Sequence, residues 1–243
     1  KDEISDIAQI GVERIKEHDG IILGKTNVPE AGSSGTTENK LGDDCRNPWN
    51  LNHTAGGSSG GTGASVASGV TPVAQGSDGG GSIRIPSSFC GIYGIKGTQG
   101  RIPRRYAGPS SWHPVNFSCM GPMSRYVIDS AIMMQAMAGP HPDAESGTIQ
   151  TAPPDFISNI EKGISGKKIA WSQDFGCRPI HPDVKTNTQN AVKVFEELGA
   201  KVEPFDFTFD LDELEEPIMK VLGFASRYAS GGEELLKKDP DAF

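Results

Sequence analysis

The sequence predicts an α/β protein, because short apolar runs alternate with segments whose apolar residues recur at helical spacing. The run from Lys168 to Trp171 is typical of a strand, and so is the run from Ala200 to Phe205. Between them, Pro182 to Leu198 gathers apolar residues on one side of a helix. A strand, a helix and a second strand in this order favour a parallel pair of strands. Another strand, turn and helix surround Ser82.

The N-terminal part of the chain predicts a helix, a strand and a long loop. Asp6 and Gln9 fit a capping box, and apolar residues then continue at helical spacing until Gly20 ends the helix. The run from Ile21 to Gly24 is typical of a short buried strand. A polar loop follows from Lys25 to about Ala55, and loops of this length in compact domains tend to be functional.

The stretch from Gly56 to Gly100 is rich in glycine and serine, as flexible linkers are, but valine and isoleucine residues interrupt it. We therefore expect a packed region in which backbones approach closely. The elements expected in and after this stretch are a helix of small residues over Gly61 to Gly69, a strand over Val70 to Gly76, a short helix from Ser82 to about Cys90 broken by Pro86, a strand over Ile92 to Ile95, and a helix over Ser124 to Ala138 whose methionines fill the core.

The composition excludes several classes of protein. A net charge of −8 argues against a nucleic-acid binder, because binding phosphates needs a basic face. The apolar runs are far shorter than the roughly 20 residues that cross a bilayer. The N-terminus lacks a secretion signal, so we expect a cytoplasmic protein. The four scattered cysteines predict reduced thiols, and no spacing of His, Cys, Asp and Glu predicts a metal site, so we expect no metal and no cofactor.

Two motifs and several histidines suggest other chemistries. Gly56 to Gly60 matches the Gly-x-Ser-x-Gly pattern of a nucleophile elbow, but the polar run from Asn50 to Ala55 precedes it where an elbow needs an apolar strand. Gly24 to Thr26 resembles the end of a phosphate-binding loop, although Asp19 stands where the first glycine belongs. The histidines that could act as general bases are His53, His113, His141 and His181. Three of these histidines precede a proline, which is typical of loop residues.

The most informative pattern combines two glycine-rich blocks. Gly56 to Gly61 contains Ser58 and Ser59, and Gly76 to Pro86 contains three consecutive glycines directly before Ser82. Glycines before a serine at the start of a helix let backbone N–H groups converge on one point, as an oxyanion hole requires. The helix N-terminus adds partial positive charge there. On this chemistry alone, a catalytic turn and a tight turn that only packs are equally good interpretations.

At these residues the chain resembles the amidase signature family. The matching blocks follow the family's order and are Gly24 to Glu30, Arg46 to Trp49, Gly56 to Gly61, Gly76 to Pro86, Phe89 to Gly91, Gly94 to Thr98 and Gly121 to Arg125. The resemblance implies a mixed, twisted sheet covered by helices on both faces, in a single domain over residues 1–243. We expect its catalytic core at about 20–140 and the strand-helix-strand unit at about 165–206. Because family chains are longer, we expect this fold to be incomplete at its C-terminus.

The resemblance implies hydrolysis of amides through a serine acyl-enzyme. Ser82 corresponds to the nucleophile, and Ser58, 24 positions earlier, corresponds to the serine that follows a cis peptide bond and relays protons to a lysine. The expected donors to the oxyanion are the backbone N–H groups of Gly79, Gly80, Gly81 and Ser82. The residues expected to brace the site are Ser59, Asp78 and Arg84.

One residue of this chain corresponds to the lysine that accepts protons through the relay serine in this family. Lys1 is followed by Asp2, as the family's lysine is usually followed by an acidic residue. Lys1 lies closer in sequence to Ser58 than the family's lysine does. We therefore expect the chain to lack a segment after Ile4, with Lys1 as the catalytic lysine.

The expected partner is a small-molecule amide substrate, with no nucleic acid and no membrane, and a homodimer stays open. The loop from Ala31 to Ala55 and the segment from Arg104 to Met120 are expected to line the pocket, where Tyr106, Trp112 and Phe117 favour a flat or apolar acyl group. Two rival functions stay open. One is a non-catalytic binding subunit that keeps the fold, and the other is a glutamine amidotransferase subunit that passes ammonia to a partner acting on tRNA.

Overall fold

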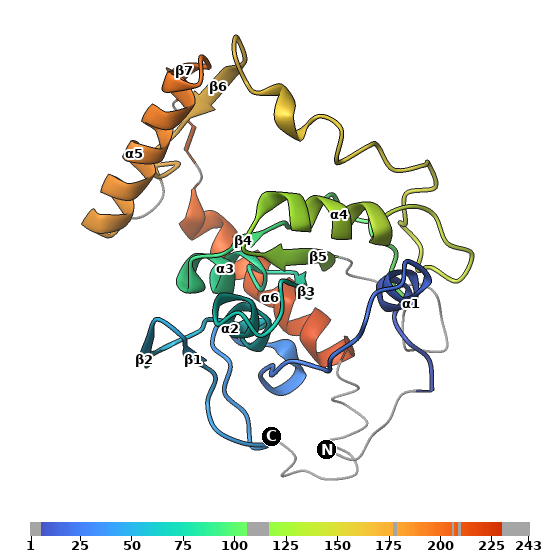
Figure 1. Cartoon of the computed structure of the whole chain (residues 1–243). Coiled ribbons are helices and arrows are strands. Elements are labelled where there is room, and N and C mark those ends of the chain that lie inside the picture. The colour runs from blue at the N-terminus through green and yellow to red at the C-terminus, as the bar shows by residue number, and fades with distance from the viewer. Residues whose placement is uncertain (1–5, 106–116, 177–178, 206, 209, 230–243) are drawn as a thin grey trace. The chain divides into compact units, whose positions relative to one another are not determined.

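The structure is a computed structural model that describes residues 6–105, 117–176, 179–205, 207–208 and 210–229. It divides the chain into two compact units, of which the first comprises residues 1–158 and 225–243 and the second comprises residues 159–224. Helices and short strands alternate in the described part of the chain (Figure 1), which confirms the α/β class. These strands form three small sheets, with two, three and two strands.

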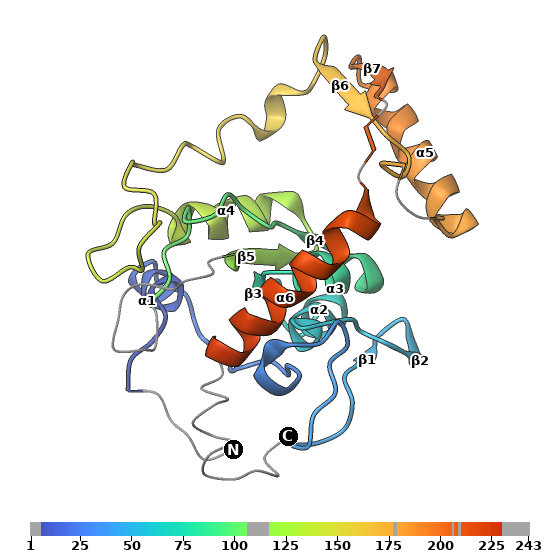
Figure 2. The same ribbon diagram turned by 180° about the vertical axis from the view of Figure 1, so that it is seen from behind.

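The first unit is built on a three-stranded antiparallel sheet with β5 in the middle. Its strands are β3 (Val73–Asp78), β5 (Cys119–Ser124) and β4 (Tyr93–Gly94). Asp78, the last residue of β3, is paired with Cys119, the first residue of β5. The helix α4 (Val127–Met137) lies on one side of this sheet and α2 (Gly60–Ala67) on the other (Figure 1 and Figure 2). The chain therefore leaves β3 at the end of the sheet and turns directly into Ser82.

The helices on either side of this turn match their predicted positions closely. α2 is made of small residues that pack tightly, and its buried members are Gly60, Gly61, Thr62, Gly63 and Val66. α3 (Arg84–Cys90) begins two residues after Ser82. The predicted break at Pro86 is wrong, because Pro86 lies in the first turn of this helix, where a missing N–H removes no helical hydrogen bond. The helix ends at Gly91, which adopts the left-handed conformation with φ 63° and ψ 41°.

A short hairpin covers the C-terminal end of α3. Its strands are β1 (Arg46–Asn47) and β2 (Asn50–Thr54). Asn47 Nδ2 donates to the carbonyl of Phe89 at 2.7 Å. Trp49 Nε1 donates to the carbonyl of Cys90 at 2.8 Å. The last carbonyls of a helix have no hydrogen-bond donors inside the helix, and these two side chains provide such donors.

The core of the first unit lies under α4. Met133, Met134 and Met137 form a buried cluster with Ile102. The residues that pack against this cluster are Ile15, Val73, Met120 and Phe156. The prediction that the methionines of this helix are core residues is therefore confirmed.

Arg14 joins α1 (Ile10–Glu17) to the end of α4. Its guanidinium donates hydrogen bonds of 2.6–3.0 Å to four consecutive carbonyls, those of Met137, Ala138, Gly139 and Pro140. These carbonyls include the last of the helix, where positive charge is favourable. One side chain thus caps α4 and holds the N-terminal helix against it.

The second unit contains a parallel strand pair, as predicted. β6 (Lys168–Trp171) and β7 (Lys201–Pro204) pair in parallel, with α5 (Pro182–Glu197) between them in sequence. The side chain of His181 accepts the N–H of Asp183 and caps this helix. The other helices here are the short η2 (Ile160–Lys162) and α6 (Leu211–Ala229), which continues into residues of the first unit.

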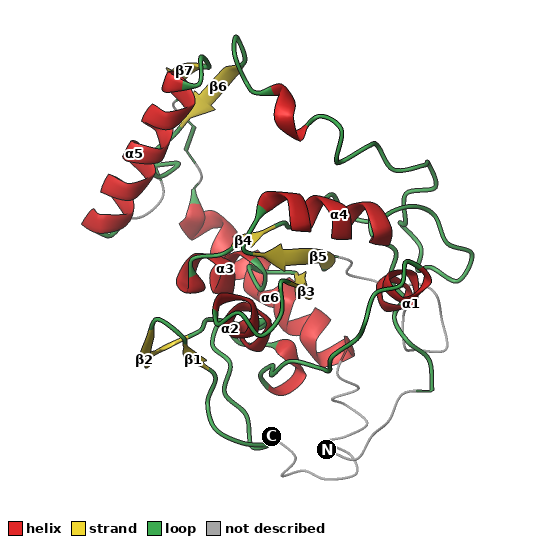
Figure 3. Cartoon of the chain, in the orientation of Figure 1, coloured by secondary structure: helices red, strands yellow, loops and turns green. Residues whose placement is uncertain are grey.

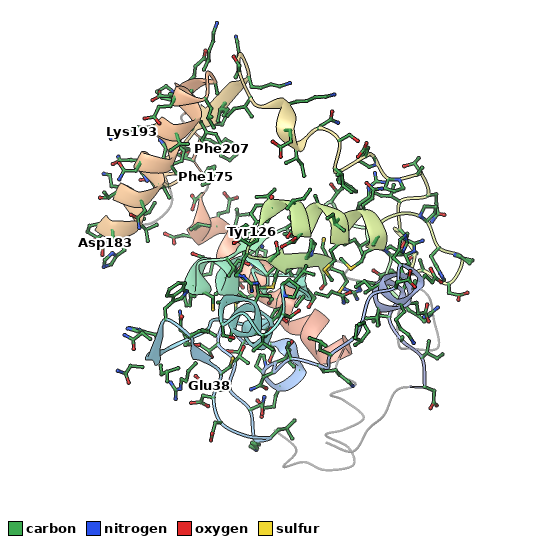
Figure 4. The ribbon with its side chains drawn as sticks, in the orientation of Figure 1. Glu38, Tyr126, Phe175, Asp183, Lys193 and Phe207 are labelled. Atoms are coloured by element: carbon green, nitrogen blue, oxygen red, sulfur yellow. The ribbon has the colours of Figure 1, made fainter. Side chains whose placement is uncertain are left out.

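Aromatic rings meet on the second unit beside its strands. Phe207 contacts Phe175 edge to face, with ring centroids 6.5 Å apart (Figure 4). It also stacks on Phe205 at a centroid distance of 5.8 Å. Both distances suit a favourable aromatic pair, so these rings stabilise the segment that follows β7.

The predicted strand at Ile21 to Gly24 is wrong. These residues lie in the long loop between α1 and β1, which is interrupted only by the short 3-10 helix η1 (Glu30–Gly32) (Figure 3). Ile21, Ile22 and Leu23 are 86%, 47% and 71% exposed. A strand needs a neighbour to pair its backbone, and an apolar run alone does not supply one. None of the described helices has both the length and the apolar character needed to cross a bilayer.

Replacing Arg14 with methionine should destabilise the first unit. The change keeps an apolar stem but removes the hydrogen bonds to the end of α4. We expect the free energy of unfolding to fall by about 2 kcal/mol, since a hydrogen bond from a charged group contributes roughly 1.5–3 kcal/mol. Urea denaturation measures the change. Lys16→Met, at an exposed position of the same helix, is the control and should alter stability by less than about 0.5 kcal/mol. Equal losses in the two variants would contradict the role of Arg14.

Candidate active site

The two predicted catalytic serines lie in backbone segments that are hydrogen-bonded to each other. Ser59, directly before α2, donates its N–H to the carbonyl of Ser82 at 3.2 Å. Ser58 precedes it, and the Gly57–Ser58 bond is cis, as the resemblance implied. Ser58 is 6% exposed and Ser82 is half-buried. Residues far apart in sequence are therefore brought together at the start of α2 and the turn before α3.

The hydroxyl of Ser59 ties the first of these segments to the central sheet. Ser59 Oγ donates to the carbonyl of Ser77 at 3.3 Å and accepts the N–H of the same residue at 3.2 Å. Ser77 is the second-last residue of β3. This pair of bonds fixes the segment that carries Ser58 beside the strand that leads to Ser82.

The loop before the hairpin closes over the segment that carries Ser58. Thr37 is completely buried, and its Oγ1 donates to the carbonyl of Gly56 at 2.8 Å and accepts the N–H of Gly60 at 3.2 Å. A Cβ on Gly57 would lie 2.5 Å from the carbonyl oxygen of Thr36, so only glycine allows this close approach. Thr37 was not singled out in the sequence, because a hydroxyl that binds a distant backbone leaves no local pattern.

Gly32 in the same loop faces the hydroxyl of Ser58. It has a positive φ of 65°, and a Cβ built there would lie 3.7 Å from Ser58 Oγ. The preceding Glu30 holds the loop closed, because its carboxylate accepts the N–H of Lys40 at 2.9 Å. That hydrogen bond lowers the pKa of the Glu30 carboxyl. The loop thus passes beside Ser58 and has a residue without a side chain near the Ser58 hydroxyl.

Asp78 organises the turn that carries Ser82. Its side chain is completely buried and accepts the backbone N–H of Gly81 at 2.8 Å and those of Ile83 and Arg84 at 3.2 Å. The guanidinium of Arg84 adds two hydrogen bonds to the same carboxylate, both of 2.9 Å. These five bonds determine the path of the chain on both sides of Ser82.

The hydrogen bonds keep Asp78 charged. Burial acts to raise the pKa of this carboxyl, but the bonds from Arg84 and from the three backbone N–H groups outweigh burial, so the pKa lies below its ordinary value. The same contact raises the pKa of Arg84. Asp78 is therefore a fixed negative charge and a hydrogen-bond acceptor, not a proton donor or acceptor at neutral pH.

The three glycines before Ser82 differ in their hydrogen bonding. Gly81 donates its N–H to Asp78 and has a φ of 130°, and a Cβ on it would lie 2.8 Å from Ile85 Cδ1. Gly80 is exposed, and a Cβ there would meet no described atom within 4 Å. In the described part of the chain, the N–H groups of Gly79, Gly80 and Ser82 are not among the donors to Asp78.

Several other predicted residues can be assigned. Those that lie outside the described residues are Lys1, Tyr106, Trp112 and His113. Phe117 is described and is 51% exposed. His141 and His181 accept the N–H of the residue two positions later, at 3.1 and 3.2 Å, which confirms them as loop residues. Among the described residues, no group of three or more His, Cys, Asp or Glu side chains could hold a metal ion.

The described cysteines are free thiols, as predicted, and they are Cys45, Cys90 and Cys119. Burial raises the pKa of Cys90 to about 11 and also raises the pKa of Cys45. A thiol with a raised pKa is protonated at neutral pH and is a poor nucleophile. We therefore do not expect Cys45 or Cys90 to compete with the serines as nucleophiles.

One family and several known proteins are similar to this chain. The protein-family model described as Amidase matches residues 2–231. The acylamidase of Rhodococcus erythropolis is 40% identical over 201 residues, which cover 83% of this chain and 41% of that protein. One component of the glutamyl-tRNA(Gln) amidotransferase of Chromohalobacter salexigens is 38% identical over 195 residues, which cover 79% of this chain and 38% of that component. The crystal structure of a bacterial aryl acylamidase of the amidase signature family matches 100% of this chain and 49% of that chain, with 33% identity and a TM-score of 0.89. The chain thus spans half or less of the length of these three proteins.

Replacing Asp78 with asparagine should weaken the turn around Ser82. The change removes the charge that binds Arg84 and replaces a strong acceptor with a weaker one. We expect the free energy of unfolding at pH 7 to fall by about 2–3 kcal/mol, as measured by urea denaturation. The matched control is Asp44→Asn, which breaks an exposed pair with Arg46 and should cost less than about 1 kcal/mol. A cost for the buried residue no larger than for the control would contradict the role of Asp78.

Asp78 should also give stability a defined dependence on pH. Its pKa is lowered on folding, so the stability that it contributes is fully present above the unfolded pKa of about 3.9 and is lost as pH falls through the folded pKa. The stability difference between the native protein and Asp78→Asn should therefore shrink below about pH 4. Thermal unfolding of both proteins from neutral to strongly acidic pH measures this difference. A stability difference between the two proteins that stays constant from neutral to strongly acidic pH would contradict this role of Asp78.

Proposed function

Because the chain belongs to the amidase family, we propose that it hydrolyses carboxylic amides, with Ser82 as the nucleophile and Ser58 as the residue that relays its proton to a lysine. The observation that carries this proposal is the hydrogen bond between Ser59 and Ser82, which joins the two serine segments. The five hydrogen bonds to Asp78 support it further, since they hold the turn before α3 in one shape. Such preorganisation lets the site meet developing charge without rearranging.

The reaction that we propose is acyl transfer in two steps. A neutral lysine takes the proton of Ser58 while Ser58 takes that of Ser82, and Ser82 Oγ forms a bond to the carbonyl carbon. The C–N bond of the tetrahedral intermediate then breaks, and the proton returns through Ser58 to the leaving amine. Water then adds to the carbonyl carbon of the acyl-enzyme and gives a proton to the relay. The ester C–O bond breaks, the relay returns the proton to Ser82 Oγ, and the acid leaves. Lys1, outside the described residues, is our candidate for the lysine.

We assign the oxyanion to backbone N–H groups at the turn before α3. Gly81 donates its N–H to Asp78, so the donors in this proposal are Gly79, Gly80 and Ser82. Gly81 instead provides the space and the backbone conformation that bring its neighbours together. Removing one oxyanion donor in a serine hydrolase typically costs about 100-fold to 1,000-fold in rate, so this turn accounts for a large share of the proposed catalysis.

The substrate that we propose is an acyl amide with a small or flat acyl group. An acylamidase and an aryl acylamidase are among the similar proteins, and the second matches the whole of this chain. Gly32 adds to this argument, because the absence of a side chain beside Ser58 leaves room for the acyl group. A panel of anilides, primary amides and ureas tests the substrate class directly.

A second candidate function is that of one component of a glutamine amidotransferase. The component of the glutamyl-tRNA(Gln) amidotransferase described above is 38% identical to this chain, so the same serine chemistry could act on glutamine and release ammonia for a partner protein. This candidate predicts glutaminase activity that depends on the partner and little turnover of anilides. Release of ammonia from glutamine and release of aniline from an anilide, measured side by side, separate the two candidates.

Labelling with a fluorophosphonate probe should depend on both serines. The probe phosphonylates an activated serine, so Ser82→Ala should lose labelling completely. Ser58→Ala keeps the nucleophile but loses the proton relay, and its labelling rate should fall by about 100-fold or more. Mass spectrometry of the labelled peptide identifies the modified residue.

Two further variants control this experiment. Ser88→Ala changes an exposed serine of the same helix that follows Ser82 and should label at the native rate. Ser59→Ala removes the bonds to Ser77 but no proton relay, so its rate should fall by much less than that of Ser58→Ala. Absence of labelling in the native protein would instead favour a non-catalytic binding protein. Labelling that persists in Ser82→Ala would rule out this residue as the nucleophile.

A further inference from the structure

Arg104 contacts two residues that are distant from it in sequence, Glu145 and Ser118. Its side chain is 16% exposed, and its Nε lies 3.4 Å from Oε1 of Glu145, which is 5% exposed. The backbones of these two residues are also joined, because Glu145 donates its N–H to the carbonyl of Arg104 at 2.9 Å. Long charged side chains are rarely buried unless they are paired. This pair therefore fixes the direction of the guanidinium.

The guanidinium of Arg104 binds a residue that lies opposite the start of the proposed oxyanion turn. Arg104 Nη1 donates to the carbonyl of Ser118 at 3.2 Å. Ser118 directly precedes β5, whose first residue, Cys119, is paired with Asp78. Ser118 therefore lies opposite Gly79, and a Cβ on that glycine would be 3.7 Å from the Cβ of Ser118. Gly79 and Ser118 therefore face each other across the end of the sheet.

We propose that Arg104, held by Glu145, is a positioning residue that keeps Ser118 against Gly79 and so keeps the first N–H donor of the oxyanion turn in place. This inference rests on the proposed function, because it concerns a turn to which we assign the oxyanion. Asp78 holds the later part of the turn through Gly81, Ile83 and Arg84, but it takes no N–H from Gly79. Ser118 lies beside the turn at its first residue, which Asp78 does not bind.

The chemistry of arginine suits this role better than that of lysine. A guanidinium presents several N–H donors in a fixed plane, so its Nε can face the carboxylate of Glu145 while its Nη1 binds the carbonyl of Ser118. A lysine has a single nitrogen on a flexible stem and loses more conformational entropy in making both contacts. Arg104→Lys should therefore keep the charge but only part of the effect.

The test compares Arg104→Met and Arg104→Lys with a matched control on the same segment. The control is Arg101→Met, because Arg101 also donates to backbone carbonyls, those of Thr151 and Ala152, which are not part of the oxyanion turn. The measurements are the second-order rate of fluorophosphonate labelling, kcat and KM for an anilide, and the melting temperature. A catalytic turn that is displaced slightly should lower kcat with little effect on KM.

We expect Arg104→Met to lower the labelling rate and kcat by about tenfold to 100-fold, with KM changed by less than about threefold. Arg104→Lys should recover part of the loss, and Arg101→Met should stay within about twofold of the native rates. A further variant, Arg104→Ala, leaves space for a guanidinium ion. Added guanidinium at millimolar concentration should restore part of the labelling rate in this variant but not in Ser82→Ala. Native rates in folded Arg104→Met, or equal losses in Arg104→Met and Arg101→Met, would overturn the inference.

Glu145→Gln keeps the test decisive if Arg104→Met does not fold. This variant leaves Arg104 in place but removes the charge that orients it, so its labelling rate should fall by about threefold or more. An unchanged rate in folded Glu145→Gln would then overturn the inference. The proposed function fails in a different way, since the native protein itself would show neither labelling by the probe nor turnover of amides.

Discussion

The buried carboxylate of Asp78 is the interaction on which the candidate site depends. A buried charge is costly unless hydrogen bonds and an opposite charge satisfy it, and Asp78 meets this condition only when three N–H groups and the guanidinium of Arg84 converge on it. Those N–H groups belong to residues on both sides of Ser82. The hydrogen bonds that stabilise the buried charge of Asp78 therefore also hold the backbone of the turn in one conformation.

Close backbone packing is the second constraint, and it explains where glycine is required. The segment of Ser58 must fit between the loop at Thr36 and Thr37 and the end of β3. A side chain on Gly57 would collide with the backbone of Thr36, and a backbone cannot move aside as the end of a flexible side chain can. The high glycine content around Ser58 thus reflects packing density, since residues 56–63, which resemble a linker in composition, are buried in the structure.

Periodic segments could be predicted from the sequence, whereas contacts between distant residues could not. β6 and α5 were predicted almost to the residue, because their apolar spacing reflects local geometry. The exposed run from Ile21 to Leu23 was misassigned, since an apolar run does not specify a partner strand. Thr37 was missed for a related reason, because its hydroxyl acts through a hydrogen bond to the backbone of Gly56, 19 residues away. The supporting role of Asp78 came from a family resemblance and not from any periodic pattern.

The adjacent serines Ser58 and Ser59 place identical side chains in different surroundings. Both are almost fully buried, so burial does not distinguish them. Ser59 directs its hydroxyl at the central sheet, where it both donates to and accepts from Ser77. The hydroxyl of Ser58 instead lies near Gly32 in the loop, where a built Cβ would be 3.7 Å from it. A hydroxyl that already serves as donor and acceptor to the sheet is poorly suited to relay protons, so this comparison favours Ser58 over Ser59 for the relay that we propose.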